Sequence, residues 1–260
     1  MTIFFHELKR SRISLLIWTA VLAFMMAITV LIFPQMKPQM SQMENMMSDM
    51  GSFSAAFGMD KMSFGRFTDY FAIECGNILG IGGAIFSAIF GVNMLSKEEK
   101  EHTAEFLYVH PVSRFRIVTE KLAALVAQVV VFNTAVAAIS LVTVASIGED
   151  SDISVLLLLF LAYMLLELEI SMICFGISAF LQSGIGVGIG TSIGMYFLNI
   201  IANITEDAKF LKYITPFAYT EGADIIKNHT ISATYLLIGM CMALVAVVIA
   251  FYRIQTKDLK

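Results

Sequence analysis

The sequence predicts an all-α, polytopic membrane protein with six transmembrane helices. Of the 260 residues, 58% are hydrophobic and 15% are charged, a far more apolar composition than that of a soluble domain. A helix needs about 20 apolar residues to cross the hydrocarbon core of a bilayer. Polar segments separate six apolar runs of that length, which predict one membrane domain over residues 1–260 without a soluble appendage: Ile13–Phe33, Phe71–Leu95, Leu122–Ile147, Ile153–Leu181, Ile185–Ile204 and Ile231–Tyr252.

The first element expected is a short helix over residues 1–12. Apolar Phe4, Phe5 and Leu8 alternate there with charged side chains. This pattern is typical of a helix lying in the cytoplasmic interface, and a plain juxtamembrane tail is the alternative. The apolar run that follows is too long for the hydrophobic part of a signal peptide. It leads into Phe33-Pro34-Gln35 rather than a small-residue cleavage site, so we expect it to be retained as an anchor.

A methionine stripe occupies the segment between the first two runs, Pro34–Asp69. Its members recur at steps of four and three residues, which places them on one face of a helix: Met36, Met40, Met43, Met47 and Met50. Thioether ligands select Cu(I), so a copper site is one interpretation. We favour an apolar face turned toward lipid or a partner subunit, because methionine commonly serves as an adaptable packing residue.

A densely charged block, Ser96–Lys121, separates the second and third runs. Its polar start suits a helix, and apolar residues then supply a contact face: Lys97, Glu98, Glu99, Lys100 and Glu101, followed by Ala104, Phe106, Leu107 and Val109. Pro111 ends this helix, and Ser113 is suited to cap the helix that enters the third span. We therefore expect a short amphipathic helix in the cytosol, held between two spans.

The positions of lysine and arginine predict that both termini are cytoplasmic. The outer side then receives the acidic turn Gly148–Asp152 and a second outer segment, Thr205–Thr230. Pro216 breaks any continuous helix in that segment, so short helices or a folded loop are expected there. The cations expected inside are Lys9, Arg10, Arg12, Lys97, Lys100, Arg114, Arg116, Lys121, Arg253, Lys257 and Lys260, and those outside are Lys37, Lys61, Arg66, Lys209, Lys212 and Lys227.

The charged block resembles the corresponding segment of the permease subunits of ABC-2 type exporters. Between their second and third spans, those proteins carry a charged stretch ending in threonine, an apolar segment, a Pro-Val/Ile-Ser-Arg turn and a later lysine. This sequence has the same order: Glu98, Glu99, Thr103, Leu107, Pro111, Val112, Ser113, Arg114 and Lys121. The resemblance extends through six spans, the N-terminal helix and the proline-containing outer segment. One departure is His102, where the family commonly has glycine.

The resemblance implies a subunit embedded in the cell membrane whose transport is driven by a separate ATPase. Residues 96–118 would form the coupling helix that sits in a groove of a cytosolic ABC ATPase, and residues 1–12 would be the elbow helix. The subunit would work with a second permease subunit, identical or different, and with two ATPase copies that bind ATP and Mg. This chain has no G-x-x-x-x-G-K-[ST] motif, so no cofactor is expected in it. The coupling residues implied are Glu98, Glu99, Thr103, Phe106, Leu107, Pro111 and Arg114.

Glycines at four-residue steps in the second and fifth runs allow close helix contact. They suit either packing within the subunit or contact across a dimer. In the resembling family, the first and fifth spans meet across the dimer and the second and fifth spans line the conduit. The glycines are Gly76 and Gly80 in the second run, and Gly186, Gly190 and Gly194 in the fifth.

Glu167 and Glu169 lie near the middle of the fourth run, where a carboxylate costs about 2.5–3.5 kcal/mol on insertion scales. Two residues apart on a helix, they point to nearly opposite faces. We expect each to be protonated or hydrogen-bonded to groups such as Asn133 or Gln128. The alternative is an ion-coupled secondary transporter, in which both relay protons and no ATPase is required. Four asparagines suit helix packing or the conduit: Asn77, Asn93, Asn199 and Asn203.

Other function classes find little support in the sequence. The histidines are scattered and H-E-x-x-H does not occur, which argues against an intramembrane hydrolase. Each cysteine falls in an apolar run, where it is interpreted as a small hydrophobic residue: Cys75, Cys174 and Cys241. No basic tract suggests nucleic acid. No motif identifies the substrate, and an amphipathic or lipid-facing cargo is preferred because the candidate conduit is apolar and rich in glycine.

Overall fold

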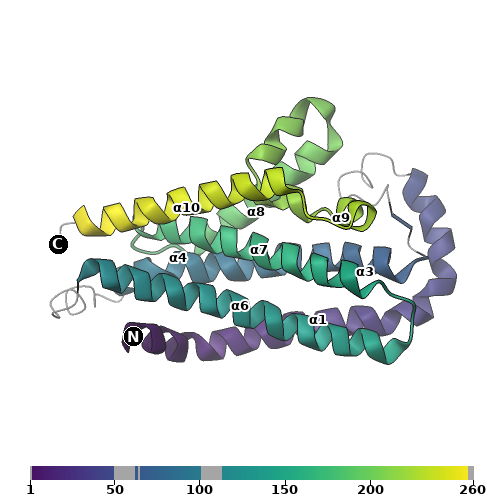
Figure 1. Cartoon of the computed structure of the whole chain (residues 1–260), viewed down its shortest axis with the longest axis horizontal. Helices are drawn as coiled ribbons and strands as arrows, with labels where there is room; N and C mark the ends of the chain where they lie inside the picture. The colour runs from purple at the N-terminus through teal and green to yellow at the C-terminus, as the bar shows by residue number, and fades with distance from the viewer. Residues whose placement is uncertain (1, 50–61, 64, 101–112, 257–260) are drawn as a thin grey trace.

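The computed structural model describes residues 2–49, 62–63, 65–100 and 113–256, and the regular structure in this part of the chain is helical. Six helices run lengthwise beside one another (Figure 1). Each is long and apolar enough to cross a membrane, which confirms the predicted fold class. They are Thr2–Gln39, Phe67–Glu98, Arg114–Ile147, Ile153–Ser178, Ile185–Ile204 and Ala233–Thr256.

The first span belongs to one long helix, α1 (Thr2–Asp49). The structure shows no separate helix over residues 1–12, because α1 continues without a break through Arg12 and Ile13. The predicted end at Phe33 is also wrong, since α1 continues past Pro34 and Pro38. Each proline removes one backbone donor, and Figure 1 shows the helix turning away from the bundle toward its end. The methionine stripe is helical as far as Met47, and Met50 lies outside the described residues.

The second span is built from three consecutive segments, α3 (Phe67–Cys75), η2 (Gly76–Gly83) and α4 (Ala84–Lys100). It is longer at both ends than the predicted run. The middle segment, η2, is a π-helix whose eight residues include four glycines: Gly76, Gly80, Gly82 and Gly83. Glycine tolerates an irregular helical backbone more readily than larger residues, and π-helical segments are rare and frequent at functional sites.

The remaining spans begin and end at recognisable caps. Helix α6 (Arg114–Ile147) starts well before the predicted Leu122, because Ser113 Oγ accepts a hydrogen bond from Arg116 N, as the sequence predicts for this cap. Asp152 caps the start of α7 (Ile153–Ser178), which ends before the predicted Leu181 in a turn. Helix α8 (Ile185–Ile204) has the predicted bounds, and α10 (Ala233–Thr256) is displaced toward the C-terminus from its predicted run.

Three short helices join α8 to α10. They are η3 (Glu206–Tyr213), η4 (Pro216–Thr220) and α9 (Gly222–Asn228). Pro216 begins η4 and Thr215 Oγ1 accepts a hydrogen bond from Phe217 N at 3.3 Å. The predicted break at Pro216 is therefore confirmed, and short helices rather than a plain loop fill this segment.

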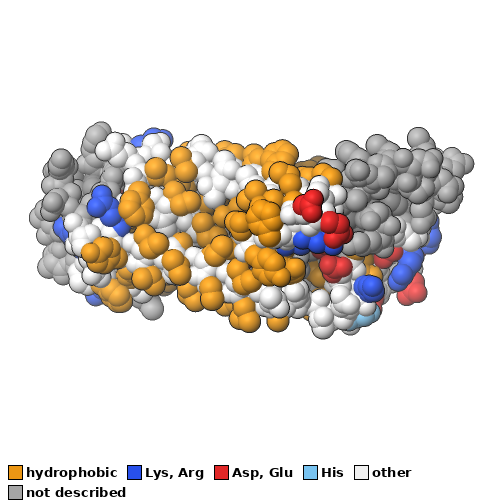
Figure 2. All heavy atoms as spheres, turned by 90° about the horizontal axis from the view of Figure 1, so that it is seen from above, with side chains coloured by type: hydrophobic (Ala, Val, Ile, Leu, Met, Phe, Trp, Pro, Cys, Tyr) orange, Lys and Arg blue, Asp and Glu red, His pale blue; other side chains and the backbone are white. Residues whose placement is uncertain are grey.

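Helices α4 and α7 form the centre of the bundle. Helices α1 and α6 pack together on one side, while α8 packs on α4 and α10 on α7 (Figure 1). The second and fourth spans are accordingly the most buried. In the most apolar 18-residue stretch of each, 72% and 56% of the stretch is buried inside the protein, against 22% for the first, fifth and sixth spans. Figure 2 shows hydrophobic side chains over the middle of the molecule and most charged ones toward its ends. The outer helices thus present apolar surface to lipid or to another subunit.

Candidate functional site

One end of the bundle gathers the start of α1, the end of α4, the start of α6 and the end of α10 (Figure 1). The predicted coupling segment, residues 96–118, is attached here. Its flanks belong to α4 and α6, and residues 101–112 join them. Four predicted coupling residues lie outside the described residues, namely Thr103, Phe106, Leu107 and Pro111, and so does the side chain of Glu99.

The flanks are held together by a buried ionic cluster, which we define as Glu7, Lys97, Glu98 and Lys121. Lys121 Nζ donates to Glu7 Oε1 at 3.0 Å and to the Met94 carbonyl oxygen at 2.7 Å, and it also pairs with Glu98. Lys97 pairs with the other oxygen of Glu7. The Lys121 and Glu7 side chains are only 1% and 3% exposed. The cluster is neutral overall and ties α1, α4 and α6 to one another.

Glu98 was expected among the residues that contact an ATPase. In the structure its side chain is 11% exposed and pairs with Lys121, so its carboxylate is turned into the subunit. Sequence reasoning missed Glu7 as the partner of Lys97 and Lys121. The alternation of charged and apolar residues near the N-terminus marked Glu7 as part of a helix, but nothing in that pattern identified which cation it would meet.

Helix α6 makes two further links at this end. Glu120 Oε2 accepts hydrogen bonds from the Ile3 and Phe4 backbone nitrogens, at 3.0 and 3.2 Å, and so caps the start of α1. Arg114 Nη1 donates to the Ile254 and Gln255 carbonyl oxygens near the end of α10, at 3.1 and 3.2 Å. The first two turns of α6 therefore contact α1, α4 and α10 through polar groups.

The carboxylate of Glu167 is fully buried between α7, α6 and α4. Its Oε2 accepts hydrogen bonds from Asn133 Nδ2 at 2.7 Å and Ser87 Oγ at 3.3 Å, which confirms the expected partner Asn133. The other suggested partner, Gln128, makes no side-chain hydrogen bond to a described residue. The carboxylate occupies the space that a side chain at Gly83 would need.

Glu169 lies on the other face of α7, as the spacing predicts. It contacts Gly239 of α10, which leaves room for its carboxylate, and it lies near the phenol of Tyr219 in η4. Neither carboxylate oxygen accepts a hydrogen bond from a described residue, so the hydrogen-bonding partner expected for Glu169 is not found there. Burial, and then the nearby Glu169 carboxylate, raise the pKa of Tyr219, so that phenol stays protonated. The two glutamates thus have separate surroundings and do not form one proton-sharing pair.

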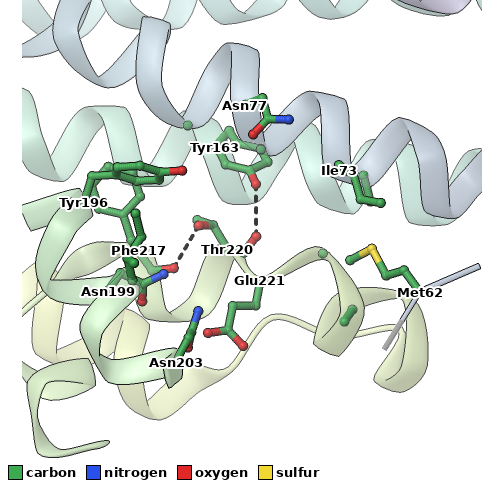
Figure 3. Close-up of a pocket in the computed structure, with 16 residues that line it drawn as sticks. Met62, Ile73, Asn77, Tyr163, Tyr196, Asn199, Asn203, Phe217, Thr220 and Glu221 are labelled. Carbon is green, nitrogen blue, oxygen red and sulfur yellow. Dashed lines mark hydrogen bonds between the residues drawn. The ribbon is translucent and has the colours of Figure 1, made fainter. Parts of the chain in front are cut away.

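A small recess lies between η2, α7, α8 and the short helices η4 and α9 (Figure 3). It has a volume of about 70 Å³. Gly76 and Gly80 line it and pack on Tyr163; a methyl group at Gly76 would lie 3.1 Å from the Tyr163 hydroxyl. That hydroxyl donates to the Thr220 carbonyl oxygen at 3.1 Å and so connects the fourth span to η4. The predicted glycines of the second run therefore form a wall of this recess.

The family of the chain is decided by a match along almost its whole length. The family model described as ABC-2 family transporter protein matches residues 1–259. The chain belongs to this family. No curated protein matches it. The resemblance inferred from the charged block is thereby confirmed. The ABC-2 protein is a multi-pass membrane subunit of a transporter and is not itself an enzyme.

The glycines of α8 divide into two groups in this ABC-2 protein. Gly188 packs on the Ala88 carbonyl oxygen and Val92 of α4. The three predicted contact glycines are exposed, and a side chain added at any of them would meet nothing within 4 Å in the described structure: Gly186, Gly190 and Gly194. Packing within the described part of the subunit does not use them, which leaves these three positions accessible to another molecule.

Proposed function

We propose that this chain is the permease subunit of an ATP-driven exporter, in which it forms the translocation path and is moved by a separate cytosolic ABC ATPase. The family supports a transporter subunit. The chain contains no phosphate-binding loop of the G-x-x-x-x-G-K-[ST] type, so another polypeptide must supply the ATP- and Mg-binding site. The complex would contain two permease subunits, identical or different, and two ATPase subunits.

The observation that carries this proposal is the attachment of residues 96–118. Lys121 of α6 binds Glu7 of α1 and Glu98 of α4, and Arg114 binds the end of α10. A force applied to residues 101–112 would therefore reach four spans through short, polar contacts. Such a rigid connection suits hinge or shear motion driven from the cytosol.

The orientation we propose follows from the charges at each end. Cations are concentrated at the end that carries the ionic cluster, which by the positive-inside rule faces the cytoplasm and places both termini there. Among described residues, that end has Lys9, Arg10, Arg12, Lys97, Lys100, Arg114, Arg116, Lys121 and Arg253, against Lys37, Arg66, Lys209, Lys212 and Lys227 in the outer segments.

The ATPase partnership is tested by replacing residues 101–109 with a glycine–serine segment of equal length. This leaves Lys97, Glu98 and Lys121 in place, so the subunit should still insert and fold. We expect affinity-purified wild-type chain to bring down a Walker-motif ATPase from its own membranes, and the variant to lose it. The matched control replaces the exposed outer pair Glu206 and Lys209 with serine and should retain the ATPase. Equal recovery with all three proteins would contradict the proposal.

The competing class, an ion-coupled carrier, is tested at Glu167. Glutamine preserves the shape of the side chain and can still accept from Asn133 and Ser87, but it cannot carry a proton. We expect Glu167→Gln cells to export the same amphipathic dyes as wild type, with export lost on ATP depletion and retained when an ionophore collapses the proton gradient. Export that fails in the glutamine variant or with the ionophore, but survives ATP depletion, would favour the carrier.

A further inference from the structure

The recess of Figure 3 is lined by several uncharged hydrogen-bonding side chains. Asn77 of η2 and Asn199 and Asn203 of α8 supply three carboxamides. Tyr196 and Thr220 add hydroxyl groups. Asn199 and Asn203 are four residues apart and so lie one turn apart on the same face of α8. The recess thus receives donors and acceptors from both the second and the fifth span.

Asn199 points to a partner beyond the protein itself. Its side chain lines the recess and is only 8% exposed, yet its Oδ1 accepts no hydrogen bond from any described residue. A buried amide oxygen normally has a hydrogen-bond donor, and the exceptions in a native structure call for an explanation. The lining of the recess gives one, because a ligand placed there would bring the missing donor.

The charges around the recess indicate an uncharged ligand. Glu221 is the one charged side chain among the described lining residues, and its Oε1 accepts from Lys212 Nζ at 2.7 Å. That pairing neutralises the site, so neither an anion nor a cation finds an unpaired opposite charge. A carboxamide offers two donors and an acceptor side by side, which suits hydroxyl groups that both donate and accept. The rings of Tyr163, Tyr196 and Phe217 provide apolar surface for the attached carbons.

The size and position of the recess limit the ligand further. A volume of about 70 Å³ admits a small headgroup but not a whole lipid. Asn77, Asn203 and Glu221 are half-buried, so the recess is open on that side. Exposed apolar side chains of α8 lie close by in sequence, including Phe197, Ile201 and Ile204. An acyl chain attached to a bound headgroup would therefore find apolar protein surface and bilayer next to the recess.

We propose that this recess binds the small, uncharged, hydroxyl-bearing headgroup of an amphipathic molecule held in the bilayer. This inference rests on the proposed transport function, because it assigns the recess to the cargo of the exporter. Asn199 and Asn203 bind the hydroxyl groups, Tyr163 and Phe217 contact the carbons, and the acyl chain lies along α8. The chemical class excludes phosphorylated headgroups, for which the recess has no free cation among its described lining residues.

Binding is tested with the purified full chain in phosphatidylcholine nanodiscs, without any ATPase. Monoolein, which has an uncharged glycerol headgroup with two hydroxyls, should raise the melting temperature of the wild type by about 2–4 °C when it saturates the site. Methyl oleate has the same chain and no hydroxyl, and lysophosphatidylcholine has a zwitterionic headgroup that contains a phosphate; neither should shift the melting temperature. Free glycerol distinguishes a bilayer-held ligand from a soluble one, and it should be ineffective at the same concentration.

The matched variants are Asn199→Ala in the recess and Asn228→Ala at the exposed end of α9. We expect Asn199→Ala to melt like the wild type without ligand and to lose the monoolein shift, while Asn228→Ala keeps it. If Asn199→Ala does not fold, Tyr196→Phe provides the test and should reduce the shift. The proposal is overturned if monoolein and methyl oleate act alike, or if both recess variants keep the full shift. This experiment contains no ATPase. A negative result would therefore contradict the headgroup site without contradicting the proposed ATPase partnership, which the copurification experiment tests separately.

Discussion

Replacing Lys121 with methionine will strongly destabilise the subunit. Its side chain is 1% exposed, and its ammonium group binds Glu7, Glu98 and the Met94 carbonyl oxygen. Methionine fills similar space but leaves two buried carboxylates facing one remaining cation, Lys97. Removing one partner of a buried ion pair typically costs about 3–5 kcal/mol. The expected result is a large fall in melting temperature of the purified protein and in the yield of folded protein from membranes.

Two further variants identify charge imbalance as the cause. The double variant Lys121→Met/Glu98→Gln leaves Glu7 paired with Lys97 and makes the cluster neutral again, so it should recover much of the lost stability. Arg116→Met is the matched control, since this exposed side chain on the same helix pairs with Glu120 at 2.8 Å and its loss should cost less than about 1 kcal/mol. A double variant no more stable than Lys121→Met would show that the charges are not the reason.

The coupling end shows how far one sequence can predict tertiary contacts. Ser113 was identified correctly as a cap because a cap depends on neighbouring residues alone. Glu98 was instead expected to contact an ATPase, because it matches the charged stretch of the resembling family. In the structure it is buried because it pairs with Lys121, 23 positions later in the sequence, and Lys121 also binds Glu7 near the start of α1. Nothing local in the sequence records such a meeting.

For the spans and the intramembrane groups too, the sequence predicted local features and missed contacts between distant residues. Apolar length predicted six spans because it follows from the thickness of the bilayer. The bounds predicted for the first span were less accurate, since α1 continues as one helix past Pro34 and Pro38, beyond the end predicted at Phe33. The opposite faces of Glu167 and Glu169 followed from helix geometry. The recess did not, because it is formed by short helices whose folding back onto η2 and α8 depends on the whole bundle.

Alanine in place of Gly91 will also destabilise the fold, although alanine is the better helix former. The α-carbon of Gly91 lies against α7, and an added methyl group would collide with the Ser171 carbonyl oxygen and approach Cys174 Cβ to 3.0 Å. A backbone oxygen cannot move aside as a flexible side chain can, so α4 and α7 must separate. Overpacking of this kind costs about 1–3 kcal/mol. Thermal melting of the purified subunit measures the loss.

Gly190 supplies the opposite expectation from the same substitution. It is exposed on α8, and an added side chain would meet no described atom within 4 Å, so Gly190→Ala should leave the melting temperature unchanged or raise it. Any rise comes from the preference of a helix for alanine over glycine, which is worth up to about 1 kcal/mol of stability. A loss like that of Gly91→Ala would mean that α8 is covered by another part of the subunit.

A bulkier change at Gly190 separates the fold from the assembly. Leucine there has room in the isolated subunit, but it would hold apart two helices that meet closely at Gly186, Gly190 and Gly194. If this face of α8 contacts the second permease subunit, Gly190→Leu should lower the dimer fraction in cross-linking experiments while the remaining monomer melts normally. Gly91→Ala should instead lower the melting temperature of both forms. The contact at Gly91 lies inside the subunit, whereas Gly190 faces outward. If the proposed dimer uses α8, Gly91→Ala must therefore act on the fold and Gly190→Leu on the assembly.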